Sequence, residues 1–278
     1  MSRRRLRDGF LAVLFFGAAI VAFVFLALPI VAIFTQVEPG RLVRLLSNTV
    51  VTDALVVSFK TTLEGLVLIL VFGTPAAYLI AARRFPGRTV LVTLVELPLV
   101  LPPAVAGLGL LATFGRFGLL GSTLEALGLS VSFTQTAVVL AIAFVASPLY
   151  IRTAIAAFQA VDPNLVAASR TLGAGSTRTF FRVVLPLAFN GLAAGGALAF
   201  ARSLGEFGAT IMFAGSLQGV TQTLPLAIYE QFAVNFDVAL AMGGLLVAIS
   251  AVLLLSLRLI LSWQPSRRTS PSLFAPLS

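Results

Sequence analysis

The chain has 278 residues, of which 59% are hydrophobic and only 10% are charged, whereas a soluble globular protein is roughly 45 to 50% apolar and about 25% charged. Its formal net charge is +9, but the arginines are spread among short segments between apolar runs, which argues against a nucleic-acid-binding face. Cysteine and histidine are both absent, which excludes disulfides, thiolate chemistry, imidazole bases and nearly all zinc sites. The composition predicts an integral membrane protein.

Six apolar stretches are each long enough to cross a hydrocarbon core of about 30 Å. They predict an all-α bundle of about six transmembrane helices in one domain over residues 1–265, followed by a disordered cytoplasmic tail over 266–278. The first stretch is too long for a signal-peptide core and has no small-residue cleavage site at its end. The expected spans cover about residues 10–34, 61–82, 89–114, 133–151, 186–214 and 238–257.

Arginine and lysine positions predict the orientation of this bundle, because short basic loops stay cytoplasmic. With the N-terminus inside, the inner segments contain Arg3, Arg4, Arg5, Arg7, Arg83, Arg84, Arg88, Arg152, Arg170, Arg178, Arg182, Arg258, Arg267 and Arg268. The outer segments contain only Arg41, Arg44, Lys60 and Arg116. We therefore expect both termini on the cytoplasmic side of the cell membrane.

One inner loop, residues 162–185, carries strong helix signals. Asp162 is suited to an N-cap, Pro163 to the first helical position, and Gly173 to the position just past a helix end. A second short helix is expected over residues 177–185, ending before Pro186. These residues alone are equally consistent with a solvated loop that packs back on its own bundle.

The loop residues from Val166 to Gly173 and from Phe181 to Pro186 resemble the conserved EAA loop of ABC importer permeases. The resemblance implies a coupling helix that sits in a cleft of a separate ATPase subunit. Its motif glutamate is replaced here by Ala167, which removes one charged contact expected in the family. The ATPase-coupling residues implied are Val166, Ala167, Ala168, Ser169, Arg170, Leu172, Gly173 and Phe181.

The fifth expected span contains two ionisable residues, Arg202 and Glu206, which are costly deep in a membrane and need a partner or a water-filled cavity. Their spacing predicts one shared helix face. One interpretation is a structural ion pair. The other is a translocation pathway for an anion, with Ser203 and Thr210 offering hydroxyl contacts.

Nearby glycines in the fifth span would permit close helix approach or bending; they are Gly195, Gly196, Gly205 and Gly208. In the third span, Pro102 and Pro103 interrupt helical hydrogen bonding. The prolines fit either a kinked helix that lines the pathway or a structural kink, and the sequence does not separate the two.

The segments 201–210, 221–229 and 97–103 are similar to those of molybdate and sulfate permeases, with molybdate or tungstate permeases the nearest in length and pattern. This resemblance implies a type I ABC importer permease that moves a small oxyanion, with molybdate or tungstate as the expected substrate. It also implies a dimer of this chain, two ATP-binding cassette ATPase subunits and an extracytoplasmic oxyanion-binding protein.

Catalysis is not expected in the chain itself. The only lysine, Lys60, has no glycine-rich loop before it, so a Walker-type phosphate-binding loop is absent and ATP with Mg²⁺ is expected on the partner ATPase. No metal or other cofactor is expected in this chain.

Four alternatives remain at this stage, of which an intramembrane enzyme is the weakest because the chain has no histidine, no cysteine and no evident nucleophile with a base. The first is a sulfate importer permease of the same family. An ion-coupled secondary transporter would use Arg202 and Glu206 as its ion site, although no internal repeat is evident. A membrane scaffold would only bind a soluble partner through residues 162–182.

Overall fold

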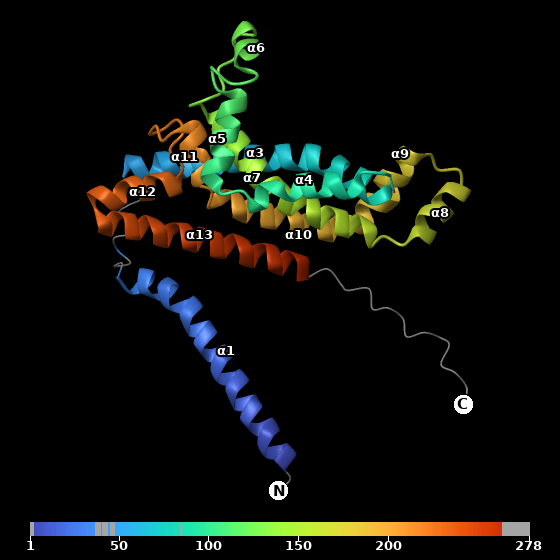
Figure 1. Cartoon of the computed structure of the whole chain (residues 1–278), viewed down its shortest axis with the longest axis horizontal. Helices are drawn as coiled ribbons and strands as arrows, with labels where there is room; N and C mark the ends of the chain where they lie inside the picture. Colours follow the sequence, from blue (N-terminus) through green and yellow to red (C-terminus); the bar gives the residue numbers. More distant parts are fainter. Residues whose placement is uncertain (1–2, 37–39, 41–43, 45–47, 84, 263–278) are drawn as a thin grey trace. The chain divides into compact units, whose positions relative to one another are not determined.

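A computed structural model describes residues 3–36, 40, 44, 48–83 and 85–262 of the chain (Figure 1). Regular structure in this described part is entirely helical. The elements are α1 Arg3–Gln36, α3 Thr49–Ala82, α4 Arg88–Val100, α5 Pro103–Phe114, α6 Gly121–Ala126, α7 Gln135–Gln159, α8 Pro163–Thr171, α9 Ser176–Thr179, the π-helical turn η1 Phe180–Val184, α10 Leu185–Leu204, α11 Gly208–Ala214, α12 Leu224–Val234 and α13 Phe236–Ser262.

Five continuous helical segments are long and apolar enough to cross a membrane, and a sixth is obtained if α4 and α5 form one broken span. The five are Leu11–Gln36, Thr49–Ala82, Gln135–Gln159, Ser176–Leu204 and Phe236–Ser256. The prediction of an all-α membrane protein with about six spans is therefore confirmed. The predicted disordered tail at 266–278 lies outside the described residues.

The second span begins earlier than the sequence predicts, at Thr49 instead of about residue 61. The added turns contain two charged residues, Asp53 and Lys60, which interrupt the apolar run. Lys60 lies within this helix, where its Nζ donates a hydrogen bond of 2.7 Å to Gln135 Oε1 of α7.

The third predicted span, 89–114, is interrupted instead of continuous. Leu101 and Pro102 have extended backbone, with ψ of 134° and 132°, and separate α4 from α5. A residue that precedes proline is driven out of the helical region by the proline ring. The run Leu101-Pro102-Pro103 imposes that restriction twice, which accounts for the break.

The fifth predicted span, 186–214, is displaced toward the N-terminus. The helix runs from Ser176 through Pro186 to Leu204, and α11 is a separate short helix. The expectation that a helix would end before Pro186 is wrong. The π-helical turn η1 ends at Val184, two residues before this proline, near the point where the regular hydrogen-bond ladder loses a donor.

Contacts divide the chain into two compact units, which are described separately. The first comprises Met1–Glu64, Pro102–Ile142 and Leu204–Ser250. A core cluster in it contains Val51, Ala54, Leu224, Ala227, Ala241 and Met242. The single domain predicted over residues 1–265 stays a prediction.

Helices α5 and α11 approach each other closely within this first unit. A Cβ added at Gly107 of α5 would lie 2.6 Å from the carbonyl oxygen of Ala209 and 2.7 Å from Met212 Cβ. A Cβ at Gly208 would lie 2.6 Å from Pro103 Cβ. Only glycine permits this separation, so the close approach expected at Gly208 is present.

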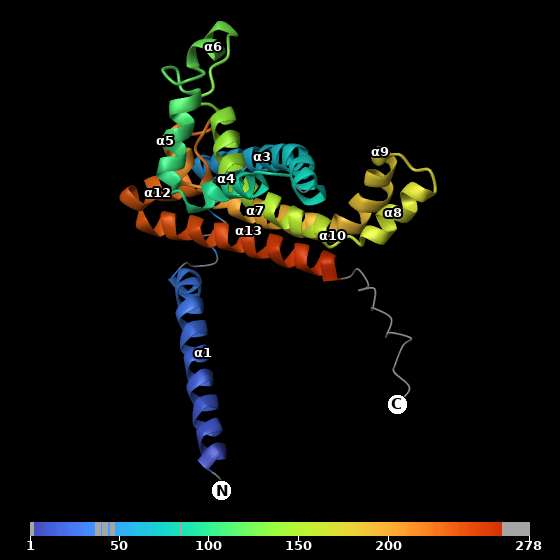
Figure 2. The ribbon, with the colours of Figure 1, turned by 45° about the vertical axis from the view of Figure 1, so that its right-hand side comes forward.

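The second unit comprises Gly65–Leu101, Ala143–Ser203 and Ala251–Ser278. Its core contains Ile69, Ala77, Ala143, Ala146, Tyr150, Ala154, Phe158, Val184, Ala188, Leu192 and Ala199. Tyr150 is buried in it and its hydroxyl lies 2.6 Å from Thr74 Oγ1, which satisfies both polar groups. The loop helices α8 and α9 lie side by side near the start of α10 (Figure 2).

Candidate functional site

The loop predicted for ATPase coupling is formed by α8 and α9 of the second unit. Asp162 accepts a 2.8 Å hydrogen bond from the backbone N–H of Asn164, and Pro163 occupies the first helical position. The start of a helix leaves several backbone N–H groups without a partner. Asp162 accepts a hydrogen bond from one of them, and Pro163 has no N–H group that would need a partner. The predicted N-terminal cap is thus present, on a helix of nine residues.

The C-terminal end of α8 is a Schellman motif centred on Gly173. Its backbone N–H donates to the carbonyl of Arg170 at 2.9 Å, and that of Ala174 donates to Ser169 at 3.1 Å. Gly173 has φ of +80°, a left-handed conformation that costs other residues about 1–2 kcal/mol. A Cβ there would meet no atom within 4 Å, so backbone conformation, not space, requires the glycine.

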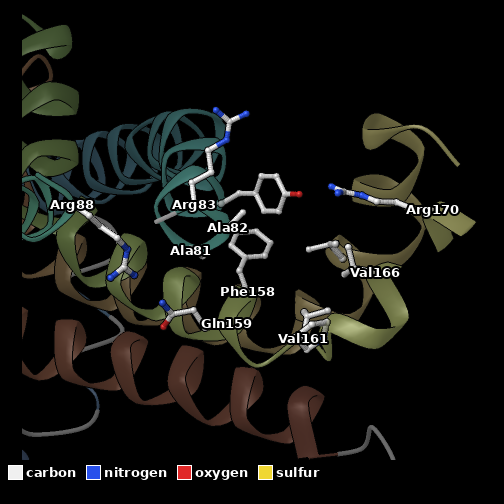
Figure 3. A pocket seen from close by; sticks show the side chains of 12 residues that line it. Ala81, Ala82, Arg83, Arg88, Phe158, Gln159, Val161, Val166 and Arg170 are labelled. Atoms are coloured by element: carbon white, nitrogen blue, oxygen red, sulfur yellow. The ribbon is translucent and has the colours of Figure 1, made fainter. Parts of the chain in front are cut away.

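One face of α8 is turned toward the rest of the second unit. Val166 packs against the core cluster, and Ser169 Oγ lies 3.0 Å from Thr179 Oγ1 of α9. Arg170 lines a cavity beside the helix (Figure 3). Val166 and Ser169 therefore hold α8 in place, whereas Arg170 faces the cavity.

The opposite face of α8 is apolar and exposed. Leu172 is 87% exposed and Leu165, seven residues earlier on the same face, is 46% exposed. Ala167 and Ala168 are also exposed. Leu165 was not among the predicted coupling residues, although the period of the helix places it beside Ala168 and Leu172.

Phe181 is the last predicted coupling residue and lies in the π-helical turn. It is 60% exposed and its ring packs edge-on against Phe180, with centroids 5.1 Å apart. Phe180 in turn contacts Tyr78, at 4.7 Å between centroids. The exposed ring therefore rests on a fixed aromatic support.

Four predicted pathway residues lie in the first unit, on or beside α5 and α11. Pro102 is the N-cap of α5 and Pro103 its first residue. Glu206 is buried, and its Oε1 accepts a 2.8 Å hydrogen bond from the backbone N–H of Ala209 in the first turn of α11. Thr210 is fully buried, and its Oγ1 has no hydrogen-bond partner among the described residues.

Arg202 and Ser203 occupy the last turn of α10. The Ser203 hydroxyl donates to the carbonyl of Ala199 at 2.7 Å. Because α10 ends at Leu204, Arg202 and Glu206 do not share one continuous helix, and that prediction is wrong. Gly205, whose absent Cβ would meet nothing within 4 Å, lies at the break.

Further buried polar groups lie in the segment that follows α11, and sequence reasoning assigned them no role. Ser216 Oγ, Gln222 Oε1 and Thr223 Oγ1 lack hydrogen-bond partners in the described part of the chain. Gln222 Nε2 donates to Glu230 Oε2 at 2.6 Å. The polar run Thr221-Gln222-Thr223 between apolar segments is the sequence signal that could have indicated these buried groups.

A family model of the inner membrane component of binding-protein-dependent transport systems matches residues 73–264. The chain belongs to this family. The matched range contains α8, α9 and the segments around α5 and α11, so every predicted site residue of the permease lies inside it.

Alignments with named relatives extend over most of the length of the permease. It is 45% identical over 239 residues to the molybdenum transport system permease protein ModB of Mycobacterium tuberculosis, covering 85% of this chain and 90% of the relative. It is 38% identical to the probable transport system permease protein NifC of Clostridium pasteurianum, over 93% and 91% of the two chains. Identity to ModB of Escherichia coli is 43%, over 64% and 78%.

Solved structures show the same fold at low sequence identity. A bacterial ABC transporter involved in the import of the acidic polysaccharide alginate matches with a TM-score of 0.72 at 17% identity, covering 94% of the permease and 97% of that chain. An inward-facing methionine ABC transporter matches with a TM-score of 0.58 at 20% identity, over 81% and 98%. The permease thus has the fold of an ABC importer membrane subunit.

Proposed function

We propose that this permease carries a small tetrahedral oxyanion, molybdate first and tungstate next, through an ATP-driven importer. The observation that carries this proposal is the 45% identity over 90% of a molybdenum transport permease. A sulfate importer and an ion-coupled transporter are the outcomes against which it is tested.

The proposed assembly contains two copies of this chain, two ATP-binding cassette ATPases and an extracytoplasmic binding protein. ATP and Mg²⁺ bind to the ATPases, and the permease itself is not catalytic. The exposed apolar face of α8 supports the docking of an ATPase, since Leu165 and Leu172 would leave water on contact. Movement of the ATPases would reach the bundle through α8, whose inner face is fixed to α9 and the core.

Co-purification tests the assembly and the substrate together. The tagged chain is extracted from its native membrane in mild detergent, and its partners are identified by mass spectrometry. We expect a P-loop ATPase and an extracytoplasmic protein that binds molybdate or tungstate. A recovered protein selective for sulfate would reassign the substrate, and recovery of the chain alone, while a control importer stays intact, would favour the ion-coupled transporter.

For the pathway, we propose that Arg202 supplies positive potential to the anion, and that Glu206, Ser203, Thr210, Pro102 and Pro103 shape its route or gate. The double variant Arg202→Met, Glu206→Gln is expected to lose oxyanion uptake. Glutamine keeps an oxygen that can accept from the Ala209 N–H, so the start of α11 is retained while the charge is removed. Uptake equal to the wild type would leave these two residues only a structural role.

Both termini and the α8–α9 loop are proposed to face the cytoplasm. The absence of cysteine makes single-cysteine labelling in intact cells direct. Ser176→Cys in α9 is expected to resist a membrane-impermeant maleimide until the cells are opened. Ser122→Cys in α6 is expected to react at once, since both serines are exposed. The reverse pattern of labelling would invert the proposed orientation.

A further inference from the structure

A cavity of about 610 Å³ lies beside α8 in the second unit (Figure 3). Its lining residues come from the end of α3, the start of α4, the end of α7, and from α8 and η1. They are Tyr78, Ala81, Ala82, Arg83, Arg88, Phe158, Gln159, Val161, Pro163, Val166, Arg170 and Val184. Three arginines and no carboxylate line the cavity, so its electrostatic potential favours an anion.

Separate elements position the three arginines around this cavity. Gly87, with φ of +86°, forms the turn that leads into α4, and Arg88 Nε donates to the carbonyl of Ile80 at 2.8 Å. That bond fixes the Arg88 guanidinium and leaves its terminal nitrogens as donors. Arg170 reaches the cavity from α8, opposite Arg88, and Arg83 lies above them (Figure 3).

Two carboxylates lie near the cavity, Asp162 next to its lining residues in the chain and Glu96 in an adjoining cavity that Arg88 also lines. Glu96 Oε1 lies 3.7 Å from Arg152 Nε in an adjoining cavity, and Asp162 caps α8. No ion pair within the described part of the chain involves Arg83, Arg88 or Arg170. Neither carboxylate therefore forms an ion pair with the three arginines.

Apart from Gln159 and the Tyr78 hydroxyl, the rest of the lining is apolar. Val166 and Val184 belong to or pack on the core, and Phe158 contacts Tyr78 edge-on with centroids 5.4 Å apart. The cavity also lies where two span-forming helices end, α3 at Ala82 and α7 at Gln159. A ligand that fits it would combine an anionic group with an apolar part and would be met at a membrane interface.

We propose that this cavity binds the phosphate headgroup of an acidic phospholipid. Guanidinium groups bind phosphate oxygens through paired hydrogen bonds, and basic pockets between membrane helices bind such headgroups. A free phosphate shares the anionic chemistry but makes no use of the apolar lining. The bound lipid would join α8 to the turn between α3 and α4. This proposal does not depend on which anion the permease transports.

Native mass spectrometry of the detergent-purified full chain tests the proposal by comparing phosphatidylglycerol with phosphatidylcholine of identical acyl chains. We expect selective retention of phosphatidylglycerol. The variant Arg83→Gln, Arg170→Gln is expected to lose it by about tenfold or more, because each arginine near a membrane surface contributes appreciably to acidic-lipid binding. The matched control Arg178→Gln, Arg182→Gln makes the same change of charge at exposed positions outside the cavity and should retain the lipid.

A second variant, Arg83→Lys, Arg170→Lys, preserves the charge and should restore most of the retention, which separates lipid binding from loss of fold. Equal retention of the two lipids, or equal loss in the variant and its matched control, would overturn the proposal. Inorganic phosphate is added in a separate arm. If phosphate binds in a way that requires Arg83 and Arg170 while phosphatidylglycerol does not, the ligand is a free anion and the lipid assignment is wrong.

Discussion

Replacing Leu172 by glutamine is expected to lower oxyanion uptake by about tenfold or more while the permease still reaches the membrane. Leu172 is 87% exposed at the end of α8, so its side chain contributes little to the fold of the isolated chain. In the proposed assembly it enters the ATPase, and truncating an apolar anchor at the centre of an interface costs about 1–2 kcal/mol or more. A loss of 1.4 kcal/mol corresponds to about a tenfold weaker association.

The measurement is uptake in cells together with the amount of ATPase that co-purifies with the tagged permease. Leu172→Met is the matched control, because methionine preserves an apolar side chain of similar volume and should keep both readouts near the wild type. If Leu172→Gln retains its ATPase and its uptake, α8 is a surface loop that packs on its own bundle. That was the competing interpretation of the sequence.

The first helix of the loop, α8, could be predicted in detail because its signals are local. An aspartate, a proline and a glycine at fixed spacing determine where α8 begins and ends, since they act through hydrogen bonds to nearby backbone. The buried face of α8 was harder to predict from the sequence. Its hydrophobic residues are few, and packing against α9 and the core decides that Val166 turns inward and Leu165 outward.

The helical class and the approximate spans could also be predicted, but several helix boundaries could not. A hydropathy window joins α10 and α11 because residues 204–208 contain only one charged residue, Glu206. What separates the helices is a contact, the hydrogen bond from the Ala209 N–H to Glu206, which gives a buried carboxylate a partner at the start of α11. From the residue spacing, Glu206 was instead predicted to lie on one face of a continuous helix.

The close packing of α5 on α11 joins residues far apart in the chain, and sequence patterns did not indicate the partner of either helix. Pro103 and Gly208 meet at one end of the contact, and Gly107 meets Ala209 and Met212 further along. Thr210, fully buried and without a hydrogen-bond partner among the described residues, lies on the same short helix. The geometry of this contact therefore determines where a predicted pathway residue lies.

Gly107→Ala is expected to destabilise the permease strongly, by about 1–3 kcal/mol, the usual cost of overpacking. The added Cβ would lie 2.6 Å from the carbonyl oxygen of Ala209, and because that atom is backbone, no side-chain rotation relieves the contact. Either α5 and α11 move apart or the bundle loses stability. The apparent melting temperature of the detergent-purified chain, followed by its monodisperse fraction after heating, measures the effect.

Gly109→Ala is the matched control on the same helix, since a Cβ there meets nothing within 4 Å. Alanine has the higher helix propensity, so this variant should be as stable as the wild type or slightly more stable. A shared loss of stability in both variants would indicate that α5 needs glycine for its backbone, not for its contact. Wild-type stability of both Gly107→Ala and Gly109→Ala would contradict the α5–α11 packing itself, and with it the placement of Pro103 beside Gly208.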